Sequence, residues 1–204
     1  MDWAPYYIGS YLAGSIPFGW LAARARGVDI RSVGSGNIGA TNVGRALGKN
    51  YAILVFTLDF LKGFIPAWLA AERAGPGSIP WEVAGVALLA VIGHNYPVWL
   101  KFQGGKGVAT SAGALMALLP LSVAVAAAVW TLFFFSTRYV SVASLAGAVS
   151  LPIATWFIRP ERPCLILTLA IMILGFIRHR SNLLALIAGT EGRSLSKNKK
   201  SSEP

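Results

Sequence analysis

The sequence predicts an all-α integral membrane protein, and three observations lead to this fold class. Apolar runs long enough to cross a bilayer recur along the 204 residues, and 55% of the chain is hydrophobic. Only 13% of the residues are charged, against about a quarter in soluble domains. Short polar segments separate the apolar runs. We therefore expect a bundle of transmembrane helices whose connecting segments carry the polar chemistry.

The charge balance favours a membrane protein over a nucleic-acid-binding protein. Lys and Arg number 18 against 8 Asp and Glu, which gives a net charge of +10. The basic residues form short clusters between apolar runs, a pattern typical of the positive-inside rule rather than of nucleic-acid binding. The single cysteine, Cys164, excludes an intrachain disulfide and a Cys-based metal site. We expect no cofactor, no metal and no nucleic-acid partner.

Prolines and buried charges mark the apolar runs. Pro17 should kink the first run near its basic end. Pro120 divides a long run, which forms either one kinked span or two short helices. Asp59 and Lys62 share a helix face in the second run, where a structural ion pair is favoured over a direct catalytic role. The predicted runs are Trp3–Ala23, Tyr51–Ala71, Trp81–Leu100, Val108–Leu119, Leu121–Phe135, Val140–Ile158, Cys164–Ile177 and a stub at Leu183–Ala188.

The distribution of Lys and Arg predicts the orientation. With seven spans and the N-terminus outside, every basic residue between spans lies on the cytoplasmic side except Arg73, Arg159 and Arg162. Merging runs gives five spans in the same orientation, but this alternative buries Arg159 and Glu161, so we favour seven. Under both counts the C-terminus and three polar segments face the cytoplasm, where those segments could form one site.

A single domain accounts for most of the chain. Residues 1–192 are expected to form one polytopic membrane domain, and residues 193–204 a polar, basic, disordered cytoplasmic tail. Asp2 and the lack of a basic segment before the first apolar run argue against a cleaved signal peptide.

The first polar segment, Ser35–Arg45, contains three glycines, two asparagines, two hydroxyls and no charge before Arg45. A backbone that bends freely and exposes its N–H groups suits close approach to an anion, although a merely flexible polar loop is the alternative. Residues Gly34–Gly39 match the spacing G-x-G-x-x-G, but no strand precedes them and no acidic residue follows about twenty positions later. A dinucleotide-binding fold is therefore rejected.

The second and third polar segments add cations and a histidine. Lys101–Gly107 is glycine-rich, yet it lacks the spacing of a phosphate-binding P-loop. Lys106 alone could be a membrane anchor, but its three glycine neighbours favour the approach of a ligand. In the third segment, His179 is either an interfacial polar residue or part of a site, whereas His94 is favoured as a structural hydrogen-bonder. Neither histidine is followed five residues later by aspartate, so that acid–base pair is absent.

Taken together, these segments resemble the signatures of the bacterial acyl-phosphate:glycerol-3-phosphate acyltransferases. The similarity covers nearly the whole chain except the tail. One departure is Leu184-Ala185, where a basic pair is expected after the asparagine. The matching segments are Ser35–Arg45, Gly93–Pro97 leading into Phe102–Thr110, His179–Asn182 with Gly189–Glu191, Leu58–Gly63 and Thr137–Ser144.

The resemblance implies an inner-membrane enzyme that moves an acyl group from acyl-phosphate to the 1-hydroxyl of glycerol 3-phosphate. The product would be 1-acyl-glycerol 3-phosphate (lysophosphatidic acid), made without a metal in the first step of phospholipid synthesis. Membrane lipid surrounds such an enzyme. The expected catalytic residues are Ser35, Lys106, His179 and Asn182. The expected substrate-binding residues are Gly34, Gly36, Asn37, Thr41, Asn42, Arg45, Gly104, Gly105, Gly107 and Ser144.

The chemistry of the residues agrees with this implication, because both substrates carry phosphate and the polar segments are cationic and rich in amides. Ser35 and the amides around Gly34 and Gly36 would hold the phosphate of the donor. Arg45 and Lys106 would hold glycerol 3-phosphate, with help from His179, Asn182 and Ser144. A transporter for a small phosphorylated anion explains the broken helices equally well, but the chain has no internal repeat. A scaffold protein would leave the glycine spacing unexplained.

Overall fold

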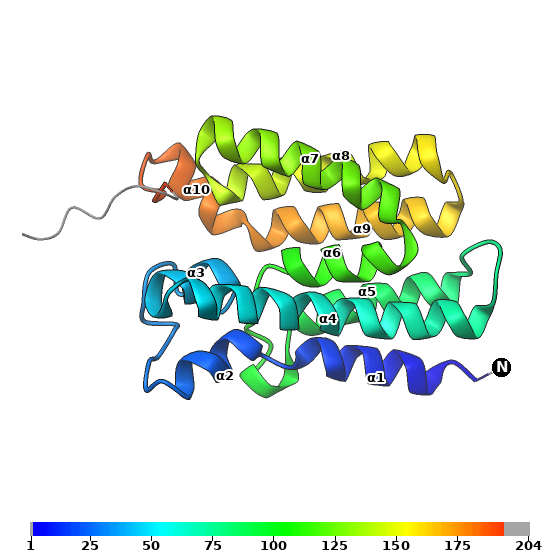
Figure 1. The fold of residues 1–204 in the computed structure, drawn as a ribbon, viewed down its shortest axis with the longest axis horizontal. Coiled ribbons are helices and arrows are strands. Elements are labelled where there is room, and N and C mark those ends of the chain that lie inside the picture. The colour runs from blue at the N-terminus through cyan, green and yellow to red at the C-terminus, as the bar shows by residue number, and fades with distance from the viewer. Residues whose placement is uncertain (1, 194–204) are drawn as a thin grey trace, which may run out of the picture.

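A computed structural model describes residues 2–193, and within them every regular element is a helix. The predicted all-α membrane fold is confirmed in this respect. The tail predicted for residues 193–204 lies outside the described residues except for Arg193. The elements, shown in Figure 1, are α1 (Ala4–Ser15), α2 (Phe18–Arg24), α3 (Ala40–Leu47), α4 (Lys49–Ala74), α5 (Trp81–Asn95), the short 3₁₀ helix η1 (Val98–Leu100), α6 (Val108–Leu118), α7 (Pro120–Thr137), α8 (Val140–Ile158), α9 (Arg162–Arg178) and α10 (Arg180–Ile187).

The first predicted span is broken rather than kinked. Ile16 adopts an extended conformation after α1, and Pro17 precedes the first residue of α2. Proline lacks the N–H that a continuous helix needs, so α1 ends here, and the carbonyl of Ile16 accepts a hydrogen bond of 3.1 Å from the N–H of Phe18. That carbonyl accepts a hydrogen bond of 2.7 Å from Nζ of Lys62 in α4. The break is therefore stabilised by a charge inside the bundle.

The predicted ion pair within the second span is confirmed. Nζ of Lys62 lies 2.7 Å from Oδ1 of Asp59, and both side chains are almost fully buried. The ring of His94 in α5 approaches the same carboxylate, with Nδ1 at 3.6 Å from Oδ1. Asp59 and Lys62 thus neutralise each other within the bundle, where burying either charge alone would be energetically costly.

Helices α4 and α6 pack at close range because glycines face the partner backbone on both sides. A Cβ on Gly63 would collide with the carbonyl of Thr110, and one on Gly113 would collide with the carbonyl of Phe60. This reciprocal contact between small residues is a common means of joining helices in membranes. It fixes the position of α6, which begins directly after the second polar segment.

The chain reverses direction at Pro120, as the seven-span topology requires. In Figure 1, α6 runs away from the end of the bundle that holds α3 and α10, and α7 returns toward that end. Among the residues that the structure describes, four helices are long and apolar enough to cross a membrane, or five if α9 and α10, bent by 54°, form one span. The seven-span count and the orientation of the termini therefore stay predictions.

Part of the first polar segment is helical, which the sequence analysis did not predict. Helix α3 begins at Ala40, so Thr41, Asn42 and Arg45 lie on a helix rather than in a loop. The helix forms because Val43 is fully buried in a small core with Ile30, Ile38 and Val55. We call residues 34–39 the first loop and residues 101–107 the second loop.

Candidate active site

The first loop is shaped by one buried side chain, that of Asn42. Its Oδ1 accepts a hydrogen bond of 3.0 Å from the N–H of Ser35, and its Nδ2 lies 2.9 to 3.2 Å from the carbonyl oxygens of Ile30, Val33 and Asn37. Asn42 is only 2% exposed. Its amide is therefore engaged within its own segment and holds the loop, which differs from the direct substrate contact expected from the sequence.

Several other groups of the first loop are also engaged internally. The N–H of Gly36 donates to the carbonyl of Val33, and the N–H of Gly39 donates to Oδ1 of Asn37. Gly34 and Gly36 have φ values of +57° and +66°, in the left-handed region that favours glycine. Within residues 2–193, no hydrogen bond involves the N–H groups of Gly34 and Asn37, so these two donors are available to a ligand.

The side chains exposed by this segment are polar or cationic. Ser35 lies at the tip of the loop, whereas Thr41 and Arg45 lie on α3, and all three are exposed. This is the arrangement expected of groups that meet a substrate from solution.

The second loop packs flat against the end of α5. The N–H of Gly104 donates to the carbonyl of Asn95, and the N–H of Gly105 donates to the carbonyl of His94, at 3.2 and 3.1 Å. A Cβ on Gly104 would collide with the same His94 carbonyl, and one on Gly105 would collide with the imidazole of His94. Both glycines were expected to bind substrate, and their N–H groups are instead engaged by α5, against which both residues pack closely.

The second loop ends where α6 begins. Gly107 caps the helix with φ of +83°, in the left-handed region, and its buried position would place any Cβ against Oδ1 of Asn95. Lys106 directly precedes this cap. The unpaired N–H groups and the dipole at a helix N-terminus favour an anion, so the cation and the helix end act in the same sense.

Lys106 is the centre of the cluster that the structure assembles from distant segments. Its Nζ donates to Oδ1 of Asn182, whose Nδ2 in turn donates to Oε1 of Glu191 at 3.0 Å. Burial lowers the pKa of Lys106 from 10.5 to about 8, an effect that Glu191 opposes and that Arg45 and Arg178 reinforce. The ammonium is thus partly desolvated, and an anion bound beside it would raise its pKa again.

The two remaining predicted residues differ in their placement. His179 is 3% exposed and its Nδ1 lies 2.8 Å from the carbonyl of Gly175, so it is fixed in the bend between α9 and α10, near Lys106. Ser144 lies in α8 and accepts a hydrogen bond of 3.2 Å from Nε1 of Trp130. Within the described residues, neither Ser144 nor Ser35 is hydrogen-bonded to the Lys106 cluster.

A guanidinium that the sequence analysis did not single out joins α9 to the second loop. Nε of Arg178 donates to the carbonyl of Gly105 at 3.0 Å, and Nη2 donates to the carbonyl of Gly104 at 2.7 Å. A second guanidinium joins the turn before the first loop to the second loop, since Nη2 of Arg31 donates to the carbonyl of Gln103 at 3.1 Å. The sequence alone does not indicate whether Arg178 or Arg180 contacts the second loop, because this depends on the helical register at the end of α9.

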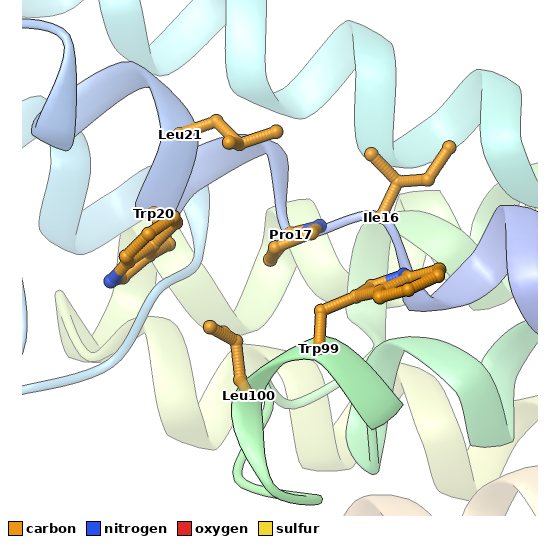
Figure 2. Close-up of a pocket in the computed structure, with 6 residues that line it drawn as sticks. All are labelled: Ile16, Pro17, Trp20, Leu21, Trp99 and Leu100. Carbon is orange, nitrogen blue, oxygen red and sulfur yellow. The ribbon is translucent and has the colours of Figure 1, made fainter.

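An apolar hollow of about 310 Å³ lies at the break between α1 and α2. In Figure 2, the indole rings of Trp20 and Trp99 lie on either side of Pro17, with Leu100 below. Leu100 also belongs to the small core beneath the first loop, and Trp20 packs against that core. The hollow is therefore continuous with the packing that supports the site.

Within residues 2–193, no group of three His, Cys, Asp or Glu side chains is arranged to hold a metal ion. The cluster instead offers fixed cations, amide groups and a helix N-terminus. Such a set of groups can bind phosphate and stabilise negative charge that develops in a reaction.

Comparisons with known proteins agree with this chemistry. A family model described as glycerol-3-phosphate acyltransferase matches residues 4–189. The glycerol-3-phosphate acyltransferase of Aquifex aeolicus (strain VF5) is 46% identical over 91% of this chain and 96% of its own length. That of Desulforamulus reducens is 48% identical over 90% of this chain and 91% of its own length.

A solved structure extends the similarity to three dimensions. The crystal structure of PlsY (YgiH), an integral membrane glycerol 3-phosphate acyltransferase, in its glycerol 3-phosphate form is 44% identical to this chain, with a TM-score of 0.90. The match covers 95% of this chain and 96% of that one, and a lysophosphatidic acid form of the same protein gives a TM-score of 0.88. The family resemblance seen in the motifs is confirmed: the chain belongs to the glycerol-3-phosphate acyltransferase family of integral membrane proteins.

Proposed function

We propose that this acyltransferase uses acyl-phosphate as its donor and acylates the 1-hydroxyl of glycerol 3-phosphate. The products are 1-acyl-glycerol 3-phosphate (lysophosphatidic acid) and phosphate, and the reaction is the first step of bacterial phospholipid synthesis. The protein lies in the bacterial inner membrane with its active site on the cytoplasmic side, where the positive-inside rule places the basic loops.

The transfer forms one carbon–oxygen bond and breaks another. The 1-hydroxyl oxygen attacks the acyl carbonyl carbon, the bond from that carbon to the phosphate oxygen breaks, and phosphate departs with the bonding electrons. The hydroxyl proton passes to an acceptor, for which a substrate phosphate oxygen is sufficient because acyl-phosphate already has a good leaving group. Catalysis then depends mainly on positioning and on stabilisation of negative charge.

The observation that carries the proposal is the environment of Lys106. Its side chain is partly buried and its ammonium donates a hydrogen bond to Asn182, and the residue directly precedes the N-cap of α6. Charge interactions are stronger in such a site than in water. We assign the phosphate of glycerol 3-phosphate to Lys106 and Arg45, with Asn182, His179 and Ser144 as supporting groups.

The donor is assigned to the first loop and to the apolar hollow. The exposed hydroxyl of Ser35 and the N–H groups of Gly34 and Asn37 are available for the phosphate of acyl-phosphate. The hollow of Figure 2, lined by Ile16, Trp20 and Trp99 among others, offers an apolar surface for the acyl chain. Two of its residues, Trp20 and Leu100, pack in the core beneath the first loop, which supports this assignment of the acyl chain.

The experiment is a donor comparison with purified protein in detergent. Radiolabelled glycerol 3-phosphate is offered with palmitoyl-phosphate or with palmitoyl-CoA, in the presence of EDTA. We expect lipid-soluble label from palmitoyl-phosphate only. Label from palmitoyl-CoA alone would overturn the donor assignment, and label from neither donor with folded protein would overturn the proposed reaction as a whole.

A further inference from the structure

The contacts of Arg178 define a role that the proposed chemistry does not use. Its guanidinium donates two hydrogen bonds, from Nε and Nη2, to the carbonyls of the consecutive residues Gly105 and Gly104. A planar guanidinium presents its N–H groups in a fixed fork, so both bonds form only when the two peptide groups hold one particular orientation. A lysine ammonium also has several N–H groups, but they rotate freely on a flexible stem and would not fix the two peptide groups in one orientation.

The N–H groups of the same two residues, Gly104 and Gly105, are held by α5. The N–H groups of Gly104 and Gly105 donate to carbonyls at the end of that helix, and the imidazole of His94 blocks any shift of Gly105 toward it. The guanidinium itself stacks over the ring of Tyr96, with Cζ 5.1 Å from the ring centre. The second loop is thus clamped between α5 and the end of α9.

Residues 178–182 contact the loop twice. Arg178 binds the backbone just before Lys106, and Asn182 accepts a hydrogen bond from the Lys106 ammonium. Both contacts come from one short segment at the bend between α9 and α10. The backbone of the second loop and the side chain of Lys106 are therefore both held by this one segment.

We propose that Arg178 is a positioning residue that sets the second loop so that Lys106 meets the phosphate of glycerol 3-phosphate. This inference rests on the proposed function, because it assigns that phosphate to Lys106. It differs from a role in which Arg178 contributes only positive charge to the substrate, since the fork geometry, rather than the charge, is what positions the loop.

The test compares Arg178→Lys with Arg178→Gln in the detergent assay, measuring KM for each substrate separately. Both changes break the fork, but only the glutamine removes the charge. We expect each to raise KM for glycerol 3-phosphate about tenfold and to leave KM for acyl-phosphate within about twofold. Arg180→Lys and Arg180→Gln are the matched controls, because Arg180 is exposed and lies two residues away, and both should match the unchanged protein.

Three outcomes would overturn the proposal. A nearly normal KM for Arg178→Lys beside a raised KM for Arg178→Gln would indicate a charge role. Equal changes in KM for both substrates would indicate general loss of structure. Unchanged values for both variants would show that the fork has no functional effect.

A second variant keeps the inference testable if the Arg178 variants do not fold. Tyr96→Leu removes the ring beneath the guanidinium but keeps the backbone carbonyl to which Tyr11 donates a hydrogen bond. We expect a rise of about threefold in KM for glycerol 3-phosphate alone, and an unchanged KM would overturn the proposal. If the protein without substitutions showed no turnover, the proposed function itself would be contradicted. Failure of the proposed function can therefore be told apart from failure of the role proposed for Arg178.

Discussion

The two glycine-rich loops are similar in composition but are held in place by different means. The first loop is supported from within its own segment, because Asn42 lies seven residues from the Ser35 N–H that it binds. The second loop is supported by elements that are distant in sequence, above all by Arg178, which lies 73 residues from Gly105. The hydrogen bonds that hold the first loop are therefore local in sequence, whereas those that hold the second loop form only in the assembled bundle.

The glycines of the two loops differ in the same way. Gly36 has a positive φ, so it serves a backbone conformation. Gly105 serves close packing, because a Cβ there would collide with the imidazole of His94. Glycine-rich sequence alone does not distinguish these two uses.

The largest effect on stability and turnover is expected from Asn42→Ala, which removes the internal support of the first loop. Several buried or half-buried backbone groups lose their partner, which costs about 3 kcal/mol. The thermal midpoint in detergent should fall by about 6–12 °C, and turnover should fall more than about a hundredfold. Thr41→Ala, on the exposed side of the same helix, is the control and should leave the midpoint unchanged. A normal midpoint for Asn42→Ala would show that the loop has other support.

An intermediate effect is expected when one glycine of each loop is replaced by alanine and, separately, by asparagine. Asparagine tolerates a positive φ better than alanine, so Gly36→Asn should retain more activity than Gly36→Ala, by about threefold. At Gly105 the order should reverse, because the larger side chain meets His94, and Gly105→Asn should be the more damaging by about tenfold. The readout is kcat/KM for glycerol 3-phosphate. The same order at both positions would contradict the distinction.

A smaller effect within the ordinary pH range is expected from the titration of Lys106. Burial lowers its pKa to about 8, so the neutral amine predominates at higher pH and no longer attracts phosphate. Because kcat/KM reports the free enzyme, its value for glycerol 3-phosphate should be level below about pH 8 and fall up to tenfold per unit above it. Lys106→Arg should move this fall beyond about pH 10, since a guanidinium stays charged. A level profile up to pH 9.5 in the unchanged protein would contradict the assignment.

Much of the fold could be predicted because the apolar runs end at clear polar breaks. Helix α8 spans Val140–Ile158, as predicted from the polar residues on either side of that run. Helices also end at Pro17 and Pro120, where proline cannot continue the helical hydrogen bonding, although Pro66 and Pro152 lie inside α4 and α8. Helix α3 was missed because its polar, glycine-containing sequence has weak helix propensity, and the burial of Val43 among residues from other segments overrides that propensity.

The site could be predicted only in part, and the limits are physical. The grouping of Lys106 with Asn182 agrees with the polar segments lying on one face. The use of Gly104 and Gly105 N–H groups by α5 depends on where that helix ends in space. The role of Arg178 depends on the direction in which the last turn of α9 points, and this direction cannot be read from the amino-acid composition.

The most direct test of this account is a crossed measurement of KM with Ser35→Ala and Lys106→Met in the detergent assay. We assign the donor phosphate to the first loop and the glycerol 3-phosphate to the second. Lys106→Met should therefore raise KM for glycerol 3-phosphate by about thirtyfold while KM for acyl-phosphate stays within about twofold. Ser35→Ala should show the opposite pattern. If both variants raised the same KM, the assignment of one phosphate to each loop would be wrong.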